Sequence, residues 1–172
     1  SFDNSNQHSW FQINTVRTNA ASADAKFVLR SPLASGDIIE SPVISEVFNN
    51  TKWNLSLKIE RAGTVPFGAP GNPTTQFLSS SAGNVYQAVF SGYNYILDSL
   101  QNSFKETIQL TQDQYDKFIQ SDRTVFVGAE RNNINGSTVN YKSNVKFLNM
   151  KAWNASLDDS EIKNLSKNIF YW

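Results

Sequence analysis

Paired carboxyl groups are the first chemistry to look for in this sequence, because glycoside hydrolysis with retention requires two of them about 5 to 5.5 Å apart. Glu40 and Glu46 lie six positions apart with Pro42 between them, which means roughly 20 Å in an extended chain. The acidic residues between 158 and 161 fall where the start of a helix favours negative charge. The sequence therefore assigns no catalytic residue, and a glycosidase with carboxylates from separate strands stays a minor alternative.

The sequence also lacks the residues for nucleophilic catalysis. It contains no Cys and a single histidine, His8, in a polar leading segment. A Ser-His-Asp or Cys-His arrangement needs a histidine held in place by a core element. The glycine-containing segments 68–71 and 127–129 are not followed by the Lys-Ser/Thr pair of a phosphate-binding loop. We therefore expect a protein that is not an enzyme.

A calcium site would need six to eight oxygen ligands, normally with carboxylates among them. Asp98, with Asn94 and Asn102 nearby, comes closest to such a set, but a solvated turn explains these residues better. We therefore assign no metal ligand and no cofactor. Calcium binding stays an open alternative for which the sequence names no ligands.

Sugar recognition needs exposed aromatic rings beside polar groups, for stacking and hydrogen bonds. The residues with this chemistry are Tyr93, Asn94, Tyr95 and Phe67. They are our ligand-binding candidates. The alternative is that the tyrosines pack on a sheet face with their cross-strand neighbours.

The clearest strand that could position such groups runs from Lys52 to Arg61. Apolar and polar residues alternate along it, which predicts one buried and one wet face. Its apolar residues are Trp53, Leu55, Leu57 and Ile59.

Shorter patterns predict the remaining elements. Thr111 and Gln114 have the spacing of a capping box, which predicts a helix over 112–120. Pro42 predicts that segment 38–47 is an edge strand or two short pieces. Further strands are expected at 10–16, 26–30, 84–93, 95–100 and 104–110, with breaks near Asn94 and at 101–103.

The stretch from Thr124 to Asn168 carries the most specific order of elements. A strand ends in Val127-Gly128, a polar loop follows, and a second strand is expected from Asn144 to Trp153. Ser156 then has the position of an N-cap before a short helix.

This order resembles the C-terminal part of laminin G-like and pentraxin-like domains of the concanavalin A-like lectin/glucanase superfamily. The matching residues are Val127-Gly128, Trp153 and Leu157 to Ile162, with Lys52 to Leu57 similar to another core strand. The resemblance implies an all-β fold: a two-sheet antiparallel jelly-roll sandwich with one or two short helices. It also implies sugar binding or adhesion. Glu40 to Leu55 is loosely similar to laminin G-like segments of large phage structural proteins.

Length and composition agree with a single domain over residues 1–172, because a chain of this size buries roughly 70% of its unfolded surface. Lys plus Arg and Asp plus Glu are equal at 15 each, so neither nucleic acid nor an anionic membrane is an expected partner. No apolar segment approaches the roughly 18 residues of a membrane span. We expect a surface rich in Asn, Ser and Thr, typical of extracellular or virion surface proteins.

We therefore expect a non-catalytic carbohydrate-binding or adhesion module within a larger surface or virion assembly, excised from a longer chain that does not begin at Ser1. Its partners would be a glycan or a protein surface, and neighbouring subunits or domains. A purely structural assembly subunit without a ligand is the alternative. The apolar residues Ile169 to Trp172 favour that alternative, because such a cluster is costly to leave in water.

Overall fold

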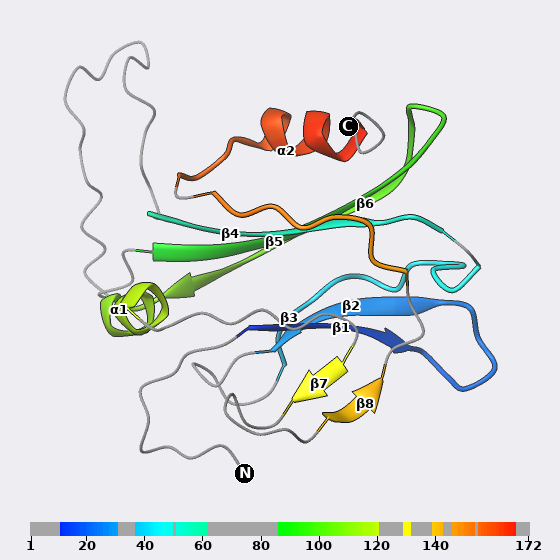
Figure 1. The fold of residues 1–172 in the computed structure, drawn as a ribbon, viewed down its shortest axis with the longest axis horizontal. Coiled ribbons are helices and arrows are strands. Elements are labelled where there is room, and N and C mark those ends of the chain that lie inside the picture. The colour runs from blue at the N-terminus through cyan, green and yellow to red at the C-terminus, as the bar shows by residue number, and fades with distance from the viewer. Residues whose placement is uncertain are drawn as a thin grey trace.

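The computed structural model of the protein shows mostly β-structure (Figure 1). Its described residues form two three-stranded antiparallel sheets, one two-stranded sheet and two short helices. The all-β expectation is confirmed at this level. The structure describes residues 11–30, 37–49, 51–61, 86–120, 129–131, 139–142, 146–153 and 155–167.

The first sheet contains, in spatial order, β1 (Gln12–Arg17), β2 (Ala25–Arg30) and β3 (Asp37–Glu40). Alternate residues of β2, which is the central strand, point into the core. The expected interruption at Pro42 is confirmed, because β3 ends before it and an isolated bridge between Ala25 and Ile44 continues the pairing. The Ser41 hydroxyl accepts a hydrogen bond from the Phe27 amide at 2.9 Å, which satisfies a backbone donor where β3 has ended.

The second sheet contains β4 (Asn54–Arg61), β5 (Tyr86–Ile96) and β6 (Ser99–Leu110) in that order. The predicted breaks at Asn94 and at 101–103 are wrong, because both segments belong to continuous strands. Asn102 and Ser103 pair with β5, and the register shifts between Asn94 and Tyr95, which leaves Gln101 without a partner in the ladder. The chain turns instead at Leu97 and Asp98, whose φ angles are 46° and 62°. Positive φ at both central residues matches the twist of a two-residue hairpin, so pairing geometry overrode the local sequence preference.

Both sheets contribute to one hydrophobic core. The rings of Phe27 on β2 and Phe104 on β6 stack with centroids 5.6 Å apart. Trp53 lies 4.9 Å from Phe27, and Phe90 meets Phe104 edge-on at 5.1 Å. Burying each of these side chains is worth about 2 to 3 kcal/mol. The predicted apolar face is confirmed, since four residues pack against this core: Trp53, Leu55, Leu57 and Ile59.

The strand expected from Asn144 to Trp153 is wrong over its described part, because residues 146–153 have no regular secondary structure. Phe147, Leu148 and Met150 are each about half exposed, and Trp153 is 49% exposed instead of filling the core. Alternating apolar residues permit a strand, but only a partner strand with free backbone groups makes one. Earlier in this stretch, β7 (Ala129–Arg131) pairs antiparallel with β8 (Val139–Lys142); Val127-Gly128 lies outside the described residues.

The first helix, α1 (Gln112–Gln120), has the predicted bounds. Its capping box is formed as expected: the Gln114 amide donates to the Thr111 hydroxyl at 3.2 Å, and the Thr111 amide donates to the Gln114 side chain at 2.9 Å. Tyr115 stacks on Tyr86 with ring centroids 3.6 Å apart. This contact anchors α1 at the start of β5.

The second helix, α2 (Asp159–Lys167), lies on the second sheet, on the side opposite the first sheet (Figure 1). The predicted N-cap Ser156 is wrong. The Asp158 carboxylate accepts the Glu161 amide at 2.8 Å, and the Asp158 amide donates to the Glu161 carboxylate at 2.8 Å. Asp158 is therefore the N-cap, because its side chain reaches the third residue of the helix.

Candidate functional site

Titratable side chains gather in a depression on the outer face of the second sheet, where β4, β6 and the start of α2 meet. It has a volume of about 400 Å³ and is open to solvent. We call it the charged depression, and it is lined by Lys58, Glu60, Lys105, Ser156, Leu157, Asp158 and Asp159.

Strand register places the basic and acidic groups on one face. Lys58 and Glu60 are two positions apart on β4, so both point away from the core. On β5, Val89 pairs with Lys58, and Ser91 pairs with Lys105 on β6. The two lysines therefore lie on the same outer face, and the first residue of α2 meets them there.

Ion pairs hold this group together. The Lys105 ammonium lies 2.5 Å from the Asp159 carboxylate, and Lys58 lies 3.6 Å from the same carboxylate and 3.0 Å from that of Glu60. The Ser156 hydroxyl donates to Glu60 at 3.1 Å. The cluster therefore connects two strands and the approach to α2.

The charged forms of these groups are favoured. The hydrogen bond from Lys105 lowers the pKa of Asp159 and raises the pKa of Lys105. Burial raises the pKa of Glu60, but hydrogen bonds from Gln87 and Lys58 outweigh it, so that the pKa lies below its usual value. At neutral pH both carboxyl groups are ionised and Lys105 is protonated.

These protonation states decide what the depression can do chemically. Oxygens of Glu60 and Asp159 both lie within 3.6 Å of the Lys58 ammonium, so the two carboxylates are neighbours that share one cation, as a glycosidase pair would have to be neighbours. A glycosidase acid needs a raised pKa to protonate the leaving oxygen. Both pKa values are shifted the other way. The arrangement suits hydrogen bonding to a polar ligand better than proton transfer.

The structure describes three of the four predicted sugar contacts, and two of these three are buried. Tyr93 is only 5% exposed, and Asn94 is 2% exposed with its amide donating to the Lys52 carbonyl at 2.8 Å. The ring of Tyr95 is partly exposed, with the Lys167 ammonium 5.7 Å from its centroid. Phe67 lies outside the described residues.

The three residues considered for calcium all lie in the β5–β6 hairpin. Asp98 lies in the hairpin turn, and Asn102 is the cross-strand partner of Asn94. Within the described residues, no group of three or more His, Asp or Glu side chains is placed to hold a metal ion.

Sequence reasoning missed Lys58, Glu60 and Lys105 as a group. The only signal was that the first two fall on the polar face of a strand. Lys105 joins them through the pairing of β5 with β6, which alternation within one strand does not reveal.

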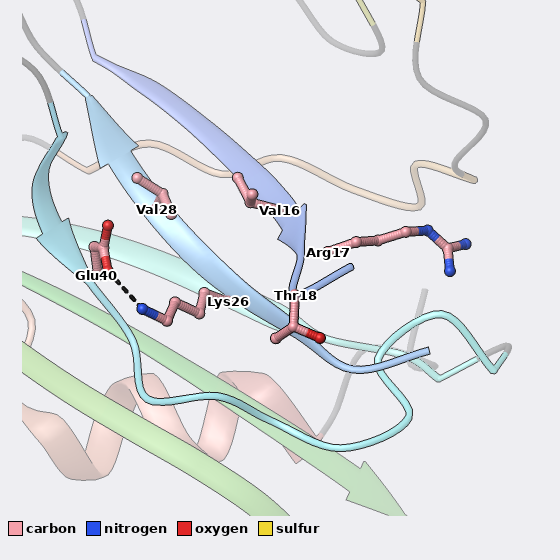
Figure 2. Close-up of a pocket in the computed structure, with 6 residues that line it drawn as sticks. All are labelled: Val16, Arg17, Thr18, Lys26, Val28 and Glu40. Atoms are coloured by element: carbon pink, nitrogen blue, oxygen red, sulfur yellow. Dashed lines mark hydrogen bonds and ion pairs between the residues drawn. The ribbon is translucent and has the colours of Figure 1, made fainter. Parts of the chain in front are cut away.

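A second depression, of about 300 Å³, lies on the first sheet (Figure 2). We call it the β1–β2 depression. Val16 and Val28 form its apolar part, and Lys26 forms an ion pair with Glu40 at 2.9 Å across it. Val16 pairs with Lys26, and Val28 pairs with Glu40, so all four side chains lie on the face turned away from the shared core.

None of the described helices is both long and apolar enough to cross a membrane.

The fold and these depressions define a mostly β protein with two antiparallel sheets around one core and a charged surface site beside a C-terminal helix. No family model, curated protein or solved structure shows a significant match to the chain. The laminin G-like resemblance therefore remains one of local sequence motifs.

Proposed function

We propose that this protein is a non-catalytic binding or adhesion module of a larger extracellular or virion surface assembly, and that carbohydrate is its ligand class. The observation that carries the proposal is the charged depression. The nearly half-exposed Lys105 and Asp159, together with the Ser156 hydroxyl, offer donors and acceptors to the hydroxyl groups of a sugar.

The finer fold is part of this proposal. Two antiparallel sheets with a shared aromatic core support a jelly-roll sandwich of the concanavalin A-like kind. One fold can carry many different functions. The sheet arrangement therefore supports only the proposed sandwich architecture, and the charged depression supports the proposed sugar binding.

The binding experiment uses a glycan array followed by calorimetry with each saccharide that binds. We expect Lys105→Gln to weaken binding at least tenfold, because it replaces a charged ammonium donor in the charged depression with a shorter, neutral amide. Lys26→Gln is the matched control, since Lys26 forms a similar ion pair on the other sheet. Absence of any glycan signal for the wild-type protein would contradict the carbohydrate proposal.

A purely structural assembly subunit is the second candidate, and exposed apolar side chains favour it. Phe147, Leu148, Met150 and Trp153 are all about half exposed within one irregular segment. Apolar groups gathered in this way mark interaction surfaces. Stable association with neighbouring subunits, together with a blank glycan array, would favour this candidate over the first.

Glycoside hydrolysis is the weakest alternative. Glu60 and Asp159 are the neighbouring carboxyl groups of the charged depression, but the pKa of each is lowered, so neither is a proton donor at neutral pH. We expect no release of nitrophenol from aryl glycosides between pH 5 and 8, and release that disappears in Glu60→Gln would establish the enzyme instead.

A further inference from the structure

The second helix lies along the outer face of the second sheet (Figure 1) and contacts it near both of its ends. Its first residue, Asp159, forms an ion pair with Lys105 on β6. In its last turn, the Ser166 hydroxyl accepts a hydrogen bond from the Asn54 side chain on β4 at 2.7 Å. The part of the sheet between these two contacts therefore lies beneath α2.

Strand register places polar side chains on this covered part of the sheet. Ser91 on β5 is the partner of both Ser56 and Lys105. Tyr93, also on β5, is the partner of Asn54, and residues paired in this way present their side chains on the same face. The Ser91 and Ser56 hydroxyls share a hydrogen bond at 2.7 Å. Ser91 is only 3% exposed and Tyr93 only 5%. We call Asn54, Ser56, Ser91 and Tyr93 the covered strip.

Much of what holds α2 on this face is polar. Of the described side chains of α2, only Ile162 and Ser166 are buried, and the buried Val89 lies on the same face of the sheet. The Ser166 hydroxyl donates to the Ile162 carbonyl at 2.7 Å as well as accepting from Asn54. Water replaces hydrogen bonds and half-exposed ion pairs of this kind at little net cost. The two sheets bury a larger apolar core, so we expect α2 to detach at a lower free-energy cost than the sheets unfold.

The covered strip has the chemistry that a sugar site requires. Tyr93 carries an aromatic ring with a hydroxyl, and the other residues of the strip carry donors and acceptors. The strip also adjoins the charged depression, because Ser91 pairs with Lys105, which lines that depression. Release of α2 would expose the strip and separate Lys105 from the Asp159 carboxylate. The depression and the strip would then form one continuous polar surface.

We propose that α2 is a releasable cover: in the closed form described above it hides the covered strip, and its release completes the sugar-binding surface. The inference rests on the proposed function, which supplies the ligand class, and it adds the regulation of that site. A saccharide that binds the strip stabilises the open form, because only the open form offers the strip to it. The cover therefore weakens the apparent affinity in proportion to the fraction of molecules that are closed.

The release of α2 can be measured with a single introduced thiol, because the chain contains no cysteine. Ser91→Cys places the thiol in the covered strip. Ser41→Cys is the matched control, since Ser41 is equally buried at 3% but follows β3 in the first sheet. In native buffer, a chromogenic aromatic disulfide should react with Ser91→Cys at least tenfold faster than with Ser41→Cys. Equal or slower labelling of Ser91→Cys would overturn the releasable cover.

A second substitution shows whether the exposure of this thiol depends on α2. Asp159→Asn weakens the ion pair with Lys105 at the start of the helix. We expect it to speed labelling at least threefold in the Ser91→Cys background and to leave the labelling of Ser41→Cys unchanged. Circular dichroism verifies that all variants are folded. The same increase in both backgrounds would indicate general unfolding and would overturn a local release.

The role of the cover in binding is tested by locking α2 in its closed position. In Asn54→Cys/Ser166→Cys, a disulfide replaces the hydrogen bond that joins these two side chains, and mass spectrometry verifies that it has formed. On the glycan array, we expect the oxidised protein to give at least tenfold less signal than the same protein after reduction. The wild-type protein with and without reductant is the control and should show no difference, because it has no thiol.

The outcomes separate this inference from the proposed function. Equal glycan signals of the oxidised and the reduced protein would overturn the cover and leave sugar binding intact. A blank array for the wild type and the reduced variant, together with fast labelling of Ser91→Cys, would contradict the sugar ligand and leave the release of α2 standing.

Discussion

The ring of Phe104 on β6 lies directly over Gly92 on β5, its partner in the strand register. A Cβ atom at position 92 would overlap this ring and would lie 2.9 Å from a methyl group of Leu55. The absence of a side chain at Gly92 is therefore what allows Phe104 to reach Phe27 and Phe90 in the core.

We expect Gly92→Ala to lower the free energy of unfolding by about 1 to 3 kcal/mol, because the added methyl group forces the Phe104 ring out of its position. Urea denaturation followed by tryptophan fluorescence measures the change. Gln101→Ala, at an exposed position of β6, is the control and should stay within about 0.5 kcal/mol. Equal stability of the Gly92→Ala variant and the wild type would show that the ring can move freely.

Trp53 and Trp153 should respond very differently to truncation. We expect Trp53→Ala to cost about 3 kcal/mol, because the ring packs between the sheets, and Trp153→Ala to cost less than about 0.5 kcal/mol at its half-exposed position. The buried indole nitrogen of Trp53 has no hydrogen-bond partner among the described residues. Trp53→Phe should therefore be much milder than Trp53→Ala in the same denaturation experiment.

The stability contributed by the pair of Asp159 and Lys105 should depend on pH in a defined direction. The pKa of Asp159 is lowered in the folded state, so its contribution is present above the unfolded value of about 3.9 and is lost as pH falls through the folded pKa. The pKa of Lys105 is raised, so its contribution is lost only as pH rises through a folded pKa above about 10.4.

Asp159→Asn should therefore cost up to about 1 kcal/mol between pH 5 and 9, a small value because both side chains are nearly half exposed. The difference from the wild type should disappear near pH 2, and high salt should reduce it. Thermal unfolding across this pH range measures the effect. Asp98→Asn is the control, and a difference that persists at pH 2 would contradict the electrostatic cause.

The two candidate N-caps of α2 can be separated by substitution. We expect Asp158→Ala to lower the melting temperature more than Ser156→Ala, because only Asp158 accepts the Glu161 amide. Ser156→Ala removes a single exposed hydrogen bond to Glu60. If differential scanning calorimetry showed a larger effect for Ser156→Ala, Ser156 would be the N-cap, as the sequence predicted.

Several elements could be predicted because their signals are local. The apolar face of β4 follows from strict alternation, and α1 follows from a capping box whose two partners are three residues apart. The interruption after β3 follows from Pro42, which cannot donate a hydrogen bond to a ladder. Each of these features depends only on residues that are close together in the sequence.

The errors concern contacts between distant segments. Asn94 and residues 101–103 suggested breaks, but the chain continues through them as β5 and β6, because the two strands pair on both sides of a single bulge. Residues 146–153 have a strand-like alternation, yet they form no strand. A segment becomes a strand only where the edge of a sheet offers it backbone hydrogen-bond partners, and its own sequence does not show whether such an edge is nearby.

The sequence by itself determined the alternating faces, the helix caps, the balanced charge and the lack of thiols, since these depend on residue type and short spacing. Only the tertiary structure decided that Lys58, Glu60, Lys105 and Asp159 share one depression and that Gly92 lies beneath an aromatic ring. The physical reason is that strand register and helix docking bring together groups up to about a hundred residues apart, and they are selected by the packing of the whole core.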